Sequence, residues 1–229
     1  MKHSYLFALV FIAFCFAACS KTSAPAPQVD PRVGTVIING YKYSTIIIGS
    51  QTWTSFNYIS EKGGSLTPPD NTYGNYYTLA QAQAIPLPAG WRIPTVDDYN
   101  KMLSTFKGSL KNGSGNYIGD TSVARALADT GLFHTLNSTD GLHKATNASG
   151  FAAFAGGEYN TGNQTYVNKL LDAAFLTSTT IQNGVAATYF FGITSDGNPI
   201  GNFTGGYYAG IDFNYSTNYA YSLRFVKDN

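Results

Sequence analysis

Cysteine is almost absent from this chain. Its 229 residues include only Cys15 and Cys19, both close to the N-terminus. No disulfide can cross-link the remainder, so a hydrophobic core must hold the folded part together. A domain of roughly 200 residues buries about 70% of its unfolded surface, which is enough for such a core. The absence also excludes chemistry that depends on a reactive thiolate within the domain.

Charge is scarce as well. Lysine and arginine total 14 and aspartate and glutamate total 13, so the formal net charge is +1, and charged residues make up 12% of the chain. A protein without a basic field does not attract nucleic acid, and charge does not hold it on an anionic surface. We therefore expect no nucleic-acid partner.

Catalytic groups are few. The sequence contains no nucleophile elbow, zinc-protease helix or phosphate-binding loop. Two histidines lie beyond the N-terminal region, His134 and His143, and each would need a carboxylate such as Asp129 or Asp140 to act. Loop histidines are more often solvated side chains. We expect a protein that is not an enzyme and has no catalytic residue.

Calcium ligands are also sparse. Residues 137–140 and 196–199 offer side-chain and turn oxygens, but calcium needs about six or more oxygens that converge. The turn-forming preference of Asn and Asp explains both stretches without a metal. The sequence predicts no metal and no cofactor.

The first eighteen residues have the pattern of an export signal. Lys2 precedes an uncharged, mostly apolar run over residues 5–18, which is shorter than the about 20 residues that span a bilayer. Residues 16–19, Phe-Ala-Ala-Cys, resemble a bacterial lipoprotein cleavage box. Cys19 would then carry the lipid and anchor the protein in the outer membrane, on its periplasmic or cell-surface face. The alternative is an ordinary secretory signal with Cys19 as a bystander.

The rest of the chain divides into a tether and one domain. Residues 19–32 are rich in Ser, Thr, Ala and Pro and lack apolar periodicity, which is typical of a disordered tether. Residues 33–229 show no internal repeat and no heptad. A single domain of mixed α and β structure is the simplest interpretation.

Local patterns predict the elements of this domain. Residues 35–48 form a β-hairpin around Asn39-Gly40, because that pair supplies the positive φ angles of a two-residue turn. Residues 78–84 and 122–130 are short helices. Thr95 is the N-cap of a third helix, whose apolar residues recur at helical spacing, namely Tyr99, Met102, Leu103 and Phe106. From Gly150 onward, glycine, polar residues and aromatics favour short strands and long ordered loops.

Six blocks occur in the order seen in one family. They are residues 41–53 with Asn57, then 73–78, 90–99, 147–157, 175–179 and 222–228. Together they resemble the Fibrobacter succinogenes major paralogous domain, over nearly all of the chain beyond the tether. Three positions depart from that pattern, with Thr54, Leu176 and Phe225 where the family usually has Met, Trp and Cys. These look like core substitutions, although the one at Leu176 could alter a binding surface.

The resemblance implies a fold and a cellular context. It implies an α+β, C-type-lectin-like single domain with short antiparallel strands, two or three helices and long ordered loops, related in fold to formylglycine-generating sulfatase-modifying domains. The cysteine chemistry of those relatives cannot be inherited here, because the domain has no cysteine. Members of the family are mostly exported proteins and lipoproteins of uncertain function, and we expect a lipoprotein of a Bacteroidetes-like bacterium.

The C-terminal quarter is the candidate binding surface. It combines tyrosine with asparagine, serine and glycine, the residue types that dominate antibody paratopes. Aromatic rings beside amides also suit sugars, which have apolar faces and hydroxyl edges. The predicted ligand-binding residues are Tyr207, Tyr208, Asn214, Tyr215, Asn218 and Tyr219. The alternative is that these tyrosines are half-buried strand residues, because strands are enriched in aromatics.

These observations predict a cell-envelope lipoprotein that binds a glycan or a protein ligand without catalysing a reaction. Its membrane contact would be the lipid on Cys19. The alternative is a structural component of the envelope or of a surface appendage, in which the same residues form a protein–protein contact.

Overall fold

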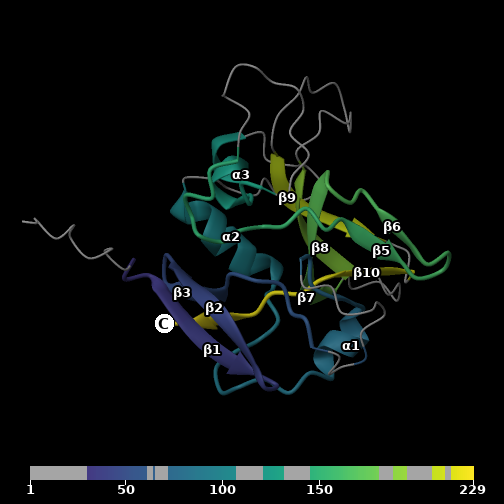
Figure 1. Cartoon of the computed structure of the whole chain (residues 1–229), viewed down its shortest axis with the longest axis horizontal. Coiled ribbons are helices and arrows are strands. Elements are labelled where there is room, and N and C mark those ends of the chain that lie inside the picture. The colour runs from purple at the N-terminus through teal and green to yellow at the C-terminus, as the bar shows by residue number, and fades with distance from the viewer. Residues whose placement is uncertain are drawn as a thin grey trace, which may run out of the picture. The chain divides into compact units, whose positions relative to one another are not determined.

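The computed structural model describes residues 30–60, 64, 72–106, 121–131, 145–180, 188–194, 208–214 and 218–229. Residues 31–229 form one compact unit, separate from residues 1–30. All helices and strands described below belong to the unit of residues 31–229. Figure 1 shows them coloured along the chain.

A four-stranded antiparallel sheet contains both the first and the last strand of this unit. Its order is β1 (Val33–Ile38), β2 (Tyr41–Ile48), β3 (Gln51–Thr54) and β11 (Val226–Asp228). The predicted hairpin is confirmed: β1 and β2 pair directly across Asn39 and Gly40, whose φ angles are 51° and 86°. Positive φ at both positions is the requirement of a tight turn between twisted strands.

A seven-stranded sheet holds the remaining strands. Its main path is β6 (Thr165–Val167), β5 (Glu158–Asn160), β10 (Tyr219–Ser222), β7 (Asp172–Thr180), β8 (Thr188–Thr194) and β9 (Tyr208–Asn214). The short β4 (Tyr76–Tyr77) also pairs with β10. Neighbouring strands are antiparallel except β10 and β7, which meet in parallel where Ser222 lies opposite Phe175. The two edges of this path are therefore β6 and β9.

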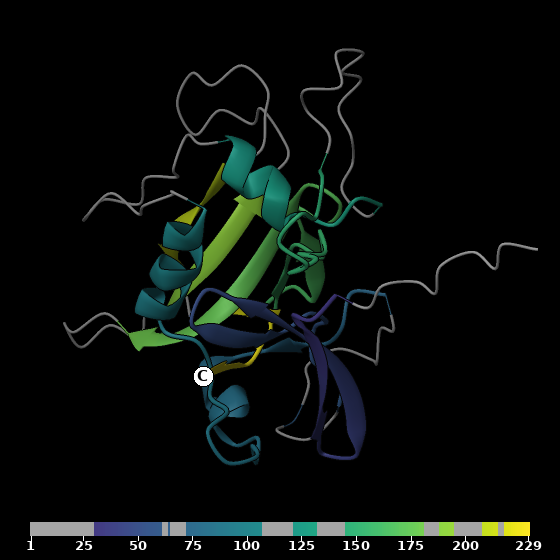
Figure 2. The same ribbon diagram turned by 90° about the vertical axis from the view of Figure 1, so that its left-hand side faces the viewer.

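Three helices are present in the described residues. They are α1 (Leu79–Gln83), α2 (Val96–Thr105) and α3 (Thr121–Leu127). Thr95 caps α2 as predicted: its hydroxyl accepts from the Asp98 amide, and the Asp98 side chain accepts from the Thr95 amide. Thr78 caps α1 in the same reciprocal way with Gln81. Such a capping box satisfies two amides that a helix start leaves without partners. Figure 2 shows α2 and α3 beside the strands of the second sheet.

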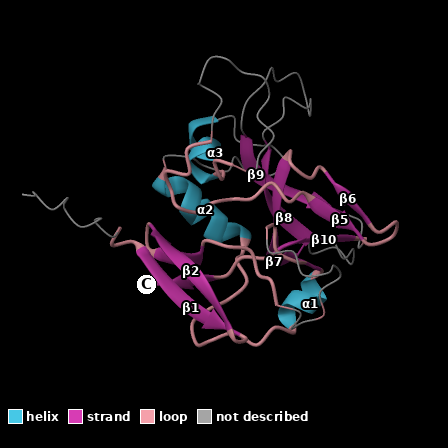
Figure 3. Cartoon of the chain, in the orientation of Figure 1, coloured by secondary structure: helices cyan, strands magenta, loops and turns pink. Residues whose placement is uncertain are grey.

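The α+β, C-type-lectin-like prediction is wrong, because the fold is mostly β. Figure 3 shows magenta strands predominating over the cyan helices. The helices have only 5, 10 and 7 residues, whereas β2 has 8 and β7 has 9, so the strands are not uniformly short. Stretches that favour a helix are short in this sequence, because glycine, β-branched and aromatic residues are frequent and have low helix propensity. The pairing of distant strands then decides the architecture.

Two buried clusters form the core. One gathers Trp53, Phe151 and Phe175 with α2 and α3, and the other gathers tyrosines and leucines around Phe225. Thr54, Leu176 and Phe225, the three departures from the family pattern, are each about 1% exposed. They are therefore core positions, and Leu176 does not contribute to a surface.

Candidate functional site

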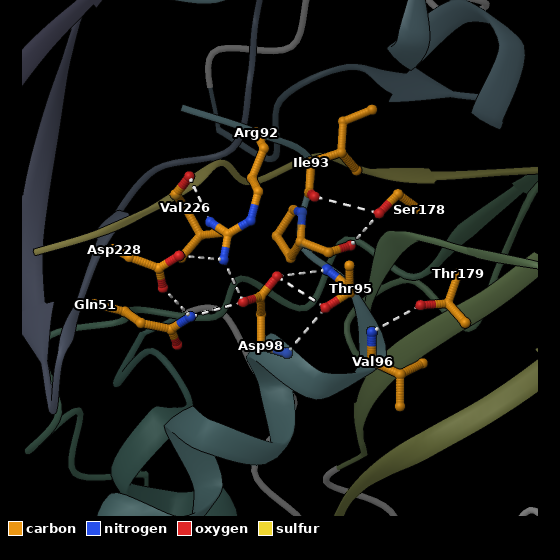
Figure 4. Close-up of polar contacts among 11 residues, drawn as sticks. Gln51, Arg92, Ile93, Thr95, Val96, Asp98, Ser178, Thr179, Val226 and Asp228 are labelled. Carbon is orange, nitrogen blue, oxygen red and sulfur yellow. Dashed lines mark hydrogen bonds and ion pairs between the residues drawn. The ribbon is translucent and has the colours of Figure 1, made fainter. Parts of the chain in front are cut away.

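The loop before α2 is held by a network around Asp98 (Figure 4). Arg92 Nη2 donates to Asp98 Oδ1 over 2.6 Å and to Asp228 Oδ2 over 3.0 Å. Gln51 Nε2 donates to the same Asp98 oxygen over 2.7 Å. The other Asp98 oxygen accepts from the amide and hydroxyl of Thr95. Because both carboxylate oxygens are engaged and Asp98 is buried, the cluster fixes β3, α2 and β11 to one another.

The other side of the same loop is tied to β7. The Ser178 amide donates to the Pro94 carbonyl over 2.8 Å, and the Val96 amide donates to Thr179 Oγ1 over 3.0 Å. The hydrogen bond from Gln51, followed by the charge of Arg92, lowers the pKa of the exposed Asp228 carboxyl. The contacts in Figure 4 join the loop before α2 and the start of α2 to β3, β7 and β11.

A second polar cluster surrounds the fully buried Arg224. Its Nε donates to Asn57 Oδ1 (2.5 Å), its Nη1 to the carbonyls of Thr54 and Phe151 (2.9 Å each), and its Nη2 to the Ala152 carbonyl (2.7 Å). The guanidinium carbon also lies 4.9 Å from the ring centroid of Phe151, within the range of a cation–π contact. Burial lowers the pKa of Arg224 to about 9, so the group is charged at neutral pH. Being fully enclosed, the guanidinium is a structural centre of the core.

An exposed aromatic group lies on the hairpin of β5 and β6. Tyr159 and Tyr166 are opposite each other in register, and their ring centroids are 5.3 Å apart. Both pack on the buried Tyr76, at 6.3 and 5.5 Å. Lys169 Nζ lies 4.6 Å from the Tyr166 ring centroid and 4.4 Å from that of Tyr73. Tyr166 remains 41% exposed. We call Tyr159, Tyr166, Tyr76, Tyr73 and Lys169 the tyrosine hairpin.

Amides order the turn of this hairpin. Asn160 Oδ1 accepts from the amides of Gly162 (2.9 Å) and Asn163 (3.3 Å). Asn163 Oδ1 accepts from Thr165 Oγ1 over 2.6 Å. Exposed polar side chains therefore lie next to the tyrosines on a turn with internal hydrogen bonds. A surface that is already ordered loses little conformational entropy when it binds.

Of the predicted binding residues that the structure describes, Tyr208 and Asn214 lie apart from each other, on a strand that does not neighbour β10. Tyr208 and Asn214 occupy opposite ends of β9, roughly 20 Å apart at about 3.4 Å per residue. β9 is separated from β10 by β7 and β8. Tyr207 and Tyr215 lie outside the described residues.

The last two of the six adjoin the tyrosine hairpin. Tyr219 is paired with Asn160, and the Thr161 amide donates to the Asn218 carbonyl over 2.8 Å. Asn218 is exposed, whereas Tyr219 is half-buried and packs on a core cluster. Tyr159 and Tyr166 are not among the predicted binding residues, although residues 159–166 contain the same mixture of Tyr, Asn, Thr and Gly.

The catalytic and metal candidates fall mostly outside the described residues. This applies to His134, His143, Asp140 and residues 196–199, and to the lipidation candidate Cys19. Asp129 is described, and its carboxylate accepts from the Gly131 amide over 2.8 Å. Within the described ranges, no three His, Cys, Asp or Glu side chains gather as metal ligands would. None of the helices in that part of the chain has the length and apolarity needed to cross a bilayer.

The fold and the site together define a mostly β domain with two structural arginine clusters and an exposed tyrosine hairpin. The model of the Fibrobacter succinogenes major domain matches residues 46–227. The chain therefore belongs to the Fibrobacter succinogenes major domain family, as its six sequence blocks predicted. No curated protein and no solved structure matches it.

Proposed function

We propose that this protein is a binding module of the bacterial cell envelope that recognises a glycan or a protein without catalysis. The observation that carries the proposal is the tyrosine hairpin, where the exposed Tyr166 ring is fixed against Tyr159 and Tyr76. Tyrosine offers a large rigid contact area at low entropic cost. Neighbouring asparagines add hydrogen-bonding groups of both kinds.

A sugar fits this chemistry well. Its apolar face packs on an aromatic ring, and its hydroxyls exchange hydrogen bonds with amides and hydroxyls. Gln164 and Thr165 are exposed and are the polar residues that immediately precede Tyr166, and the exposed Asn163 lies one residue earlier in the turn. Lys169 Nζ lies over the rings of Tyr73 and Tyr166. Its positive charge favours acidic sugars or carboxylates over cationic ligands.

Replacing Tyr166 by alanine should weaken binding roughly thirtyfold, because a central aromatic anchor contributes about 2 kcal/mol. Tyr166→Phe should retain most of the affinity if ring packing dominates. The measurement is binding on a glycan array, followed by titration of the best glycan. Tyr41→Ala is the matched control, because Tyr41 is equally exposed (45%) but lies on β2 in the other sheet.

A second set of variants locates the site. If Tyr166→Ala binds like wild type while the triple change of Tyr207, Tyr215 and Tyr219 to alanine abolishes binding, the hairpin is not the site. Thermal unfolding of each variant shows that a loss of binding is not a loss of fold.

The second candidate is a structural part of the envelope or of an appendage. Exposed tyrosines also suit protein–protein contacts, in which aromatics are enriched. In that case the purified protein should form an assembly without added ligand, and Tyr166→Ala should dissolve it.

Anchoring at the outer membrane through Cys19 is part of the proposal. Cys19→Ser should release the protein into the soluble fraction and abolish incorporation of a labelled fatty acid, because a thiol is needed for the thioether-linked lipid. Cys15→Ser is the matched control, since Cys15 lies within the predicted signal. Label retained in Cys19→Ser would contradict lipidation at this residue. Protease treatment of intact cells then tells the cell-surface face from the periplasmic face.

A further inference from the structure

β1 is an open edge of the four-stranded sheet. It pairs with β2 on one side, and no described strand lies on its other side. The Ile47 amide donates to the Arg32 carbonyl over 2.9 Å, so Arg32 and Ile47 are a hydrogen-bonded pair. Because such pairs alternate along an antiparallel ladder, the N–H and C=O groups of Val33, Thr35 and Ile37 point to the open edge.

Within β1 itself the usual protection against strand pairing is absent, and the nearest proline and charge are Pro31 and Arg32, just before the strand. β1 reads Val-Gly-Thr-Val-Ile-Ile and carries neither a charge nor a proline. Val33 and Ile37 are 51% and 66% exposed and lie on the same face of the strand, together with Thr35. Natural edge strands usually carry lysine, proline or a bulge that prevents association. An unprotected apolar edge of six residues indicates an association site.

We propose that β1 pairs antiparallel with β1 of a second copy of this chain, about a two-fold axis at Thr35. In this register Thr35 lies opposite Thr35, and Val33 lies opposite Ile37 in both directions. Each of these residues directs its N–H and C=O to the open edge, so every pair forms the two hydrogen bonds of a regular ladder. The result is one continuous eight-stranded sheet across two chains.

A second copy fits this edge because the edge is complementary to itself. A two-fold interface requires that the same patch satisfy both partners, and this register does so for the backbone and for the side chains. It places the two most exposed apolar side chains of β1 against each other, and cross-strand β-branched pairs stabilise a sheet. No charge on β1 repels the second copy. The contact closes on itself and yields a dimer rather than a filament.

The dimer would be moderate in strength. One strand pair buries less than the roughly 1,200 Å² of a stable interface, so association should depend on concentration. Crowding of anchored copies on a membrane would favour it. A dimer presents two tyrosine hairpins, which raises the avidity for a repeating ligand. The pairing itself does not rest on the proposed function.

Sedimentation of the full chain over a wide concentration range tests the proposal. Wild type should pass from monomer to dimer, and Ile37→Lys should weaken the dimer tenfold or more, because it places a charge in each Val33–Ile37 pair. Thr35→Pro should have the same effect, since it removes an outward N–H that β2 does not use. Ile47→Lys is the matched control, because Ile47 is 38% exposed on β2, away from the edge, and should dimerise like wild type.

Hydrogen exchange identifies what covers the edge. The amides of Val33, Thr35 and Ile37 should be slow to exchange at high concentration and fast at low concentration. Protection that is independent of concentration would mean that another segment of the same chain covers β1, and would overturn the proposal. A protein that remains monomeric, or a dimer that Ile37→Lys leaves intact, would overturn it as well. Unchanged circular dichroism of the variants shows that the domain is folded.

Discussion

Replacing Arg224 with methionine should unfold most of the domain at room temperature. The change removes the donors to Asn57 Oδ1 and to the carbonyls of Thr54, Phe151 and Ala152. Each buried acceptor left without a donor costs about 1–3 kcal/mol. The sum is comparable to the total stability of a domain, about 5–15 kcal/mol.

Arg224→Lys separates charge from geometry. An ammonium keeps the charge but has only three N–H donors on one nitrogen, so it cannot serve the four acceptors that the three guanidinium nitrogens reach. We expect this variant to fold with an unfolding free energy lower by about 3 kcal/mol, since a broken buried hydrogen-bond network is a large-effect change. Urea unfolding followed by the fluorescence of the buried Trp53 provides the measurement.

Lys42→Met is the control for the loss of a cation, because Lys42 is exposed on β2. It should change the unfolding free energy by less than about 0.5 kcal/mol, as surface substitutions usually do. If Arg224→Met were as stable as Lys42→Met, the guanidinium would not be the organising group of this core.

Gly157→Ala should detach the tyrosine hairpin from the rest of the sheet. Gly157 has a φ of +66°, and a Cβ there would lie 2.1 Å from the Val167 carbonyl oxygen and 2.7 Å from the Lys169 amide nitrogen. Both are backbone atoms, so the clash is relieved only when β5 and β6 move apart. The Gly157 amide also donates to the Asp172 carbonyl over 2.7 Å, which ties the start of β5 to β7.

We expect the free energy of unfolding of this variant to be lower by about 3 kcal/mol or more. About 1 kcal/mol of this comes from the unfavourable φ, and the remainder comes from the clash. Gly40→Ala isolates the first contribution, because Gly40 has a φ of +86° but nothing within 4 Å of the added Cβ. Thermal unfolding compares the two. Exchange of the β5 and β6 amides then shows whether the hairpin opens locally. Equal losses in both variants would mean that the hairpin adapts to the methyl group.

Short-range features of this fold were predictable, because they depend on neighbouring residues. The sequence predicts the Asn39-Gly40 turn and the Thr95 N-cap, and the structure confirms both. Each follows from the backbone preference of one or two residues. The capping residue Asp98 also pairs with Arg92, six residues before it in the chain. The position of Asp98 three residues after the cap turns it back toward the loop.

Long-range features were not predictable in the same way. The fold class depends on pairings such as β10 with β4, β5 and β7, which join segments far apart in the sequence. The tyrosine hairpin depends on such pairings, because Tyr159 and Tyr166 pack on Tyr76 of β4, and both β4 and β5 pair with β10. Composition alone pointed to the late tyrosines and could not show that residues 159–166 adjoin them.

The position of β10 and β11 has a consequence for how this protein is made. Residues 219–228 supply an inner strand of one sheet and the closing strand of the other. Neither sheet has all of its described strands until these residues have been synthesised, so β3, β4, β5 and β7 gain their pairing with β10 or β11 only then. A nonsense mutation before residue 219 would therefore remove an inner strand from one sheet and an edge strand from the other.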